Sequence, residues 1–145
     1  MSALRGIRGA TTVGEDTPTA IVAATSELLT GLIAANAIEP EQIAGVWFTT
    51  TPDLRSEFPA VAARRLGWVD VPLLCGQEMN APAGNPRSIP RCVRVMILLN
   101  TELRQQDMRF LYMRGATAIR EELDLARAGQ LPEPADTAAA PGAPL

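Results

Sequence analysis

The sequence predicts an α+β fold, a mixed five-stranded sheet with helices on one face. The chain has 145 residues, which suits one domain with a buried core. Apolar runs typical of strands alternate with helical patterns in the order β-α-β-α-β-β-β, which predicts helices packed on a sheet. The run 91–99 is apolar on both faces and needs a second cover, either by closure into a barrel or by a partner subunit; we favour the partner subunit.

The first half of the chain predicts a strand, a helix and a second strand. Residues 3–13 alternate loosely and end in ATTV, which is typical of a strand. Thr17 is a suitable N-cap with Pro18 at the first helical position, and apolar residues at helical spacing then predict a helix over 18–36. Residues 43–51, IAGVWFTTT, are rich in β-branched and aromatic side chains and predict the second strand.

The second half predicts shorter elements and a tail. In chain order we expect a helix, a strand, a proline-rich loop and two further strands, over residues 59–66, 71–77, 80–90, 91–99 and 109–116. From Asp124 the chain is rich in Ala, Pro and Gly and has no periodic apolar face. We therefore expect residues 1–123 to form the domain and residues 124–145 to form a disordered tail.

Composition argues against several classes of function. The formal net charge is −3 and no basic stretch dominates, which argues against nucleic-acid binding. No apolar run approaches a membrane span, and arginine interrupts the N-terminal segment, so we expect a cytoplasmic protein with no membrane contact. The chain has no histidine, which removes Ser-His and Cys-His catalysis, and two cysteines alone make a poor zinc site. We expect neither a metal nor another cofactor.

Arg94 stands in the middle of the apolar strand RCVRVMIL, on the face shared with Cys92 and Met96. A buried guanidinium without a counter-charge is very costly. The pattern leaves two partners open, a structural ion pair with Glu78 or a bound anion. It also leaves open whether Glu78 is an acid or base, an arginine partner or an acceptor for a ligand hydroxyl, and whether Cys75 is more than a core thiol.

Four motifs occur in order over residues 4–120: RGIRGATTV, TPDL followed by FPA, VPLLCGQEM, and CVRVMI followed by an LY strand. In this order they resemble the short monofunctional chorismate mutases of the bacterial class with a trimeric pseudo-α/β-barrel fold. The resemblance implies a homotrimer with an active site in each subunit–subunit cleft. It also implies the rearrangement of chorismate to prephenate, a step of phenylalanine and tyrosine biosynthesis, by electrostatic stabilisation and conformational restriction.

The same resemblance implies the roles of individual residues. Arg94 reaches the ether oxygen and the side-chain carboxylate, Arg8 binds a substrate carboxylate, and Glu78 accepts a hydrogen bond from the ring hydroxyl. Further substrate contacts fall to Tyr112, Arg64, Cys75, Phe58, Ala60, Leu73, Leu74 and Ile119. The sequence departs from the family pattern at Val61, where the pattern has lysine, and at Leu74, where it has threonine.

An alternative function stays open at this point. A small trimeric carboxylate-binding protein, such as one of the imine-deaminase-like family, uses the same kind of inter-subunit cleft and an arginine. Loss of chorismate absorbance on mixing with the protein distinguishes the two.

Overall fold

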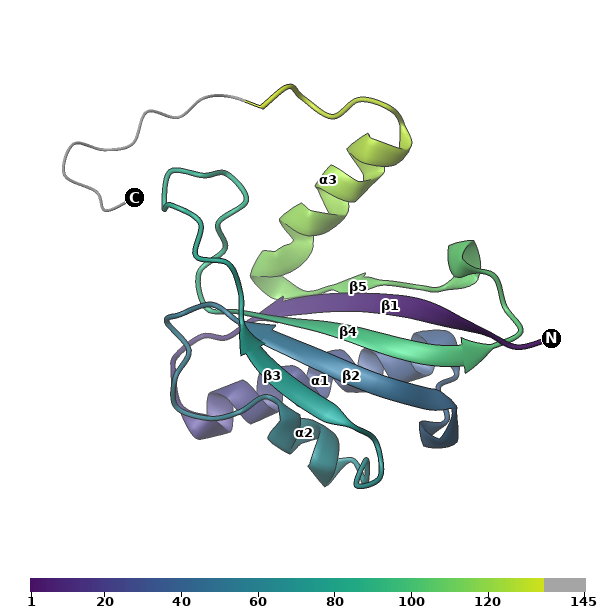
Figure 1. Cartoon of the computed structure of the whole chain (residues 1–145). Helices are drawn as coiled ribbons and strands as arrows, with labels where there is room; N and C mark the ends of the chain where they lie inside the picture. The colour runs from purple at the N-terminus through teal and green to yellow at the C-terminus, as the bar shows by residue number, and fades with distance from the viewer. Residues whose placement is uncertain (135–145) are drawn as a thin grey trace.

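A twisted mixed sheet forms the centre of the molecule in the computed structural model, which describes residues 1–134 (Figure 1). Its five strands lie in the order β3-β2-β4-β1-β5. Strand β4 runs antiparallel to both neighbours, while β5 is parallel to β1 and β3 is parallel to β2, so the predicted mixed sheet is confirmed. The strands are β1 (Ala3–Thr12), β2 (Ile43–Thr50), β3 (Leu73–Gln77), β4 (Cys92–Thr101) and β5 (Leu111–Tyr112).

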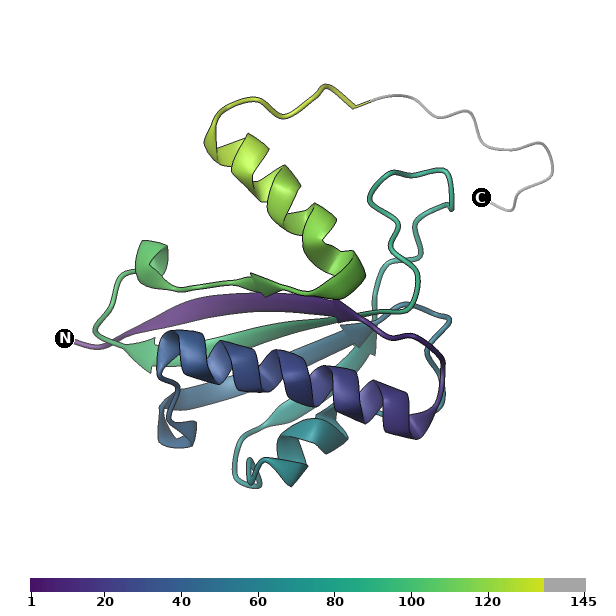
Figure 2. The same cartoon turned by 180° about the vertical axis from the view of Figure 1, so that it is seen from behind.

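Helices α1 (Pro18–Asn36) and α2 (Ala60–Arg65) cover one face of this sheet (Figure 2). The hydroxyl oxygen of Thr17 accepts a hydrogen bond from the Ala20 amide at 3.2 Å, as expected for the predicted N-cap. With 19 residues and a mean hydropathy of 1.4, α1 is long and apolar enough to cross a membrane, contrary to the sequence prediction. Its apolar side chains nevertheless pack against the sheet, where Ile21, Leu28, Leu29 and Leu32 are fully buried.

Strand β4 divides its side chains between the two faces. Val93, Val95 and Ile97 point toward α1 and are buried in the main core. Arg94, Met96 and Leu98 alternate with them and point to the other face.

Helix α3 (Thr117–Arg127) was missed by the sequence analysis and corrects two of its predictions. The strand predicted over 109–116 shrinks to β5 and continues into a 3-10 turn, Arg114–Ala116, that leads into α3. The tail predicted from Asp124 therefore begins inside a helix, and residues 128–134 have no helix or strand. The rest of the predicted tail lies outside the described residues.

The third helix also corrects the prediction that helices lie on one face only. Ile119 and Leu123, one turn apart on α3, pack against a small cluster formed by Ala10, Cys92, Tyr112 and Ala116. These residues belong to the face opposite α1, so α3 covers one end of that face. We call the whole face opposite α1 the open face; among residues 1–134 its exposed apolar side chains include Leu4, Trp47 and Leu74, which are 51%, 47% and 59% exposed.

Gly9 allows β1 to approach α1 closely. A Cβ at this position would lie 2.8 Å from Leu32 Cδ1 and 3.2 Å from the carbonyl oxygen of Leu111. A Cβ at Gly14 would meet nothing within 4 Å.

We therefore predict that Gly9→Ala lowers the free energy of unfolding by about 1–3 kcal/mol, because overpacking forces the strand and helix apart. Gly14→Ala is the control and should change it by no more than about 0.5 kcal/mol. Urea unfolding at equal protein concentration measures both. Equal stabilities of the two variants would contradict this account of the β1–α1 contact.

Candidate active site

Arg94 and Glu78 meet on the open face. The register places Arg94 opposite Thr49 of β2 on one side and Ala10 of β1 on the other. Glu78 directly follows β3; its amide donates to the Thr50 carbonyl at 2.9 Å, and its Oε2 accepts from the Thr49 hydroxyl at 2.8 Å. Arg94 Nε lies 3.5 Å from the same Oε2, so the ion pair with Glu78 is present. The question that remains is whether Arg94 also has donors for a bound anion.

The ion pair leaves Arg94 with an unused donor. Although Nε lies within ion-pair distance of Glu78, its N–H is not directed at the carboxylate, and it makes no hydrogen bond in the described chain. The buried Tyr112 hydroxyl is also without a hydrogen-bond partner there. Buried polar groups are normally satisfied, so two unused groups on one surface point to a ligand.

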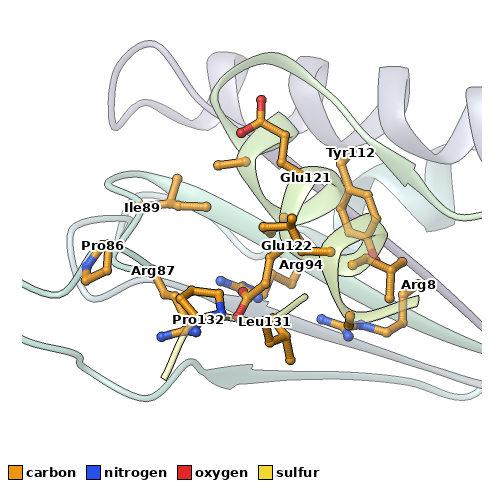
Figure 3. Close-up of a pocket in the computed structure, with 15 residues that line it drawn as sticks. Arg8, Pro86, Arg87, Ile89, Arg94, Tyr112, Glu121, Glu122, Leu131 and Pro132 are labelled. Atoms are coloured by element: carbon orange, nitrogen blue, oxygen red, sulfur yellow. Dashed lines mark hydrogen bonds and ion pairs between the residues drawn. The ribbon is translucent and has the colours of Figure 1, made fainter. Parts of the chain in front are cut away.

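Both groups line a cavity of about 510 Å³ (Figure 3). Its floor is the Arg94 end of the open face, including the exposed Arg8 side chain, and its roof is α3 with the segment that follows it. Ile119 contributes to the roof. The structure thus brings together the predicted site residues Arg8, Arg94, Tyr112 and Ile119 at one cavity, with Glu78 beside them.

Tyr112 is held from two sides. Its ring packs in the cluster with Ala10 and Cys92 and is only 9% exposed. The guanidinium carbon of Arg120, on α3, lies 5.2 Å from the ring centroid, within cation–π range, and Arg120 also donates to the carbonyl of Phe110. The position of the tyrosine oxygen is therefore fixed before any ligand binds.

The remaining predicted residues form a second group beside α2. Cys75 pairs with Phe48 in the β2–β3 ladder and so points toward the helices, while Leu74 points to the open face. Burial raises the pKa of the Cys75 thiol, and a hydrogen bond donated by the Ala60 backbone and the charge of Arg64 only partly oppose this shift. Cys75 is therefore a neutral thiol at neutral pH, which argues against its use as a nucleophile.

This second group adjoins a different cavity, of about 610 Å³, lined by Cys75, Gly76 and the segment 50–59. Phe58 is 65% exposed at its edge, whereas Ala60, the first residue of α2, is buried. Among residues 1–134, none lines both this cavity and the Arg94 cavity. Within one chain the structure does not bring the two groups together: Phe58, Ala60, Arg64, Leu73 and Cys75 lie apart from Arg94.

Asp16 fastens the segment that carries Phe58. Its Oδ1 accepts hydrogen bonds from the Arg55 and Ser56 amides at 2.9 and 3.0 Å, and the Ser56 hydroxyl donates to its carbonyl at 2.8 Å. The bond from the Arg55 amide, with those from Ser56, lowers the pKa of Asp16 below its usual value of 3.8 despite some desolvation.

Sequence reasoning missed three residues, two that line the Arg94 cavity and one that lies beside it. Thr49 orients Glu78, and alternation along 43–51 could have placed it on the face of Trp47. Arg87 and Glu122 line the cavity and form an ion pair with each other. Only the i, i+4 spacing of Ile119 and Leu123 signalled the helix that carries Glu122.

Comparison with known proteins identifies the family. The model of the family "Chorismate mutase type I" matches residues 4–123. The chain belongs to the type I chorismate mutases. It is 48% identical to chorismate mutase AroH of Thermus thermophilus over 125 residues, covering 86% of this chain and 99% of that protein. It is 39% identical to AroH of Bacillus subtilis over 129 residues, with 88% and 98% covered.

A solved structure agrees with these sequence matches. The chorismate mutase from Clostridium thermocellum superposes with a TM-score of 0.74 at 40% identity, covering 78% of this chain and 97% of that one. The recognition made from the four motifs is therefore confirmed, as is the α+β fold class. Family membership makes the protein an isomerase of aromatic amino acid biosynthesis and sets the imine-deaminase-like alternative aside.

We predict that Asp16→Ala frees the segment 55–58 and raises the KM for chorismate several-fold without unfolding the protein. Because the folded pKa of Asp16 is lowered, its contribution is present above about pH 3.8 and is lost as the pH falls through the folded value. Hydrogen-exchange protection of the Arg55 and Ser56 amides should follow this profile, and Asp16→Ala should lack it throughout. Protection unchanged in the variant would contradict the role.

Proposed function

We propose that this protein converts chorismate to prephenate in a cleft between two copies of the chain, with no acid–base or covalent step. The observation that carries the proposal is a pair of buried groups, Arg94 Nε and the Tyr112 hydroxyl, that have no hydrogen-bond partner among residues 1–134 and lie at a cavity also lined by Arg8.

Charge stabilisation is the first part of the mechanism. In the rearrangement a C–O bond breaks while a C–C bond forms within one molecule, and no proton is transferred. The breaking ether oxygen gains negative charge in the transition state. A guanidinium fixed in a water-poor cavity stabilises that charge more than it stabilises the substrate, which lowers the barrier. Arg94 is suited to this task because its planar fork can donate to the ether oxygen and a carboxylate together.

Conformational restriction is the second part. Chorismate has two carboxylates and a flexible enolpyruvyl ether, and it reacts only when the ether folds over the ring. Arg8 and Tyr112 anchor a carboxylate, and Glu78, oriented by Thr49, accepts from the ring hydroxyl. Holding the substrate at several points lowers the activation barrier, because the conformational entropy of the flexible ether is lost on binding and not in the reaction step. None of these steps needs a cofactor or a metal.

A homotrimer would complete the site. In a cyclic assembly the contacts are head-to-tail, so each subunit presents one surface to one neighbour and a different surface to the other. The Arg94 group of one subunit can then face the Phe58–Cys75 group of the next. The exposed apolar side chains of the open face support such an assembly, because burying them between subunits would remove apolar surface from water. We place the enzyme in the cytoplasm, as expected for a step of amino acid biosynthesis.

We predict that Arg94→Ala lowers kcat about 10²- to 10³-fold, the usual effect of removing one preorganised donor. Arg94→Lys should recover little of this loss, because an ammonium keeps the charge but cannot form two parallel hydrogen bonds. Loss of chorismate absorbance measures both, with circular dichroism as the control for folding. Parental turnover by Arg94→Lys would show that the fork geometry is irrelevant.

Mixing subunits tests where the site lies. Arg94→Ala disables one group, and Arg64→Glu, at an exposed position, disables the other by repelling a carboxylate. Co-expressed at equal levels, the two variants should recover about a quarter of the parental activity, because each site of a head-to-tail trimer draws two independent subunits. A site within one chain would recover none. Sedimentation of the mixture confirms that the trimer has formed.

A further inference from the structure

Arg87 is the third arginine of the Arg94 cavity, and neither the motifs nor the family resemblance singled it out. It lies on the loop that joins Glu78 to β4. It also lines a smaller cavity, of about 270 Å³, together with Glu78 and Arg94. Figure 3 shows Arg87 beside Glu122, and its side chain is 54% exposed, as expected at the rim.

The loop holds Arg87 in place through its own turns. The Asn85 amide donates to the Pro82 carbonyl at 2.8 Å, and the Ser88 amide donates to the Asn85 carbonyl at 2.9 Å. The Arg87 amide donates to Asn85 Oδ1 at 2.8 Å. Side chain and backbone of Asn85 together fix the position from which the arginine extends.

Glu122 holds only one edge of the guanidinium. Arg87 Nε lies 2.5 Å from Glu122 Oε1, while its two terminal nitrogens have no hydrogen-bond partner among residues 1–134. Both side chains of the pair are partly exposed, so solvent screens the pair and it adds little to stability. The ion pair therefore orients the guanidinium and offsets part of its charge, but it leaves the two terminal nitrogens as donors for an anion at the rim.

We propose that Arg87 is a specificity residue that binds the outer of the two substrate carboxylates, while Arg94 and Tyr112 hold the inner end. This inference rests on the proposed function, since it needs a substrate with two anionic ends in this cavity. The outer carboxylate does not change its charge during the rearrangement. Arg87 therefore binds the ground state and the transition state equally, which affects KM and leaves kcat alone.

Four variants test the proposal by steady-state kinetics with chorismate. Arg87→Ala should raise KM about tenfold, as expected for the loss of a charge-assisted hydrogen bond at a partly exposed site, with kcat within about twofold. Arg87→Lys should restore KM to within about threefold, because a point charge suffices at the rim. Glu122→Gln keeps the cation and should change KM by less than about threefold. Arg104→Ala, the control for lost charge, replaces an arginine paired with Asp107 on the turn after β4 and should match the parent.

Salt dependence separates anion binding from a structural role. Added KCl should raise the KM of the parent more steeply than that of Arg87→Ala, because salt screens the contact that the variant lacks. An unchanged KM in Arg87→Ala, with the parent active, overturns this inference alone. Equal increases in Arg87→Ala and Glu122→Gln also overturn it, because the pair then only joins the loop to α3. A parent that does not convert chorismate overturns the proposed function and this inference together.

Discussion

The two-residue alternation of β4 is the constraint on which the site depends. Because Val93 and Val95 must point into the core beneath α1, Arg94 between them has to point to the opposite face. A guanidinium in that position is tolerable because α3, which covers this end of the opposite face, leaves a cavity above the side chain instead of packing on it. The main core and the proposed catalytic cation are thus two consequences of one register, and a one-residue slip would exchange the two faces of the strand.

Glu78 and Thr49 stabilise the charge of Arg94 without using all of its hydrogen-bond donors. A bidentate ion pair would satisfy the guanidinium but would also fill the donor directions that a substrate needs. Here the carboxylate lies 3.5 Å from Nε and off its N–H direction, and the Thr49 hydroxyl holds it there. A buried donor without a hydrogen-bond partner destabilises the fold by about 1–3 kcal/mol, and an oxygen atom of a bound ligand can remove this penalty. The cavity is therefore organised for an anion before one arrives.

The sequence predicted features whose signals are local to one element, and it did not predict contacts between residues far apart in the chain. Periodicity and capping fixed α1 with its Thr17 cap and the strands β1, β2 and β4, because those signals lie within the elements themselves. The pairing of Thr49 with Glu78, and of Arg87 with Glu122, spans 29 and 35 residues, so no local pattern contains it. Helix α3 was missed because most of its residues are polar or charged, although its few apolar side chains gather on one side. The residue roles came from the family resemblance, since the composition around Arg94 left its partner undecided.

The floor and the roof of the cavity differ in how they are held. The floor is a central strand with neighbours on both sides and α1 beneath it, so changes there affect the stability of the whole chain. The roof depends on the small cluster around Tyr112, on Arg120 at the Phe110 carbonyl and on the exposed Arg87–Glu122 pair. Few buried contacts place such a segment at the low-stability end of a structure. Substitutions in α3 should therefore change mainly the cavity, through the position of the Tyr112 hydroxyl and the charge at the rim. They should change the free energy of unfolding of the whole chain only slightly.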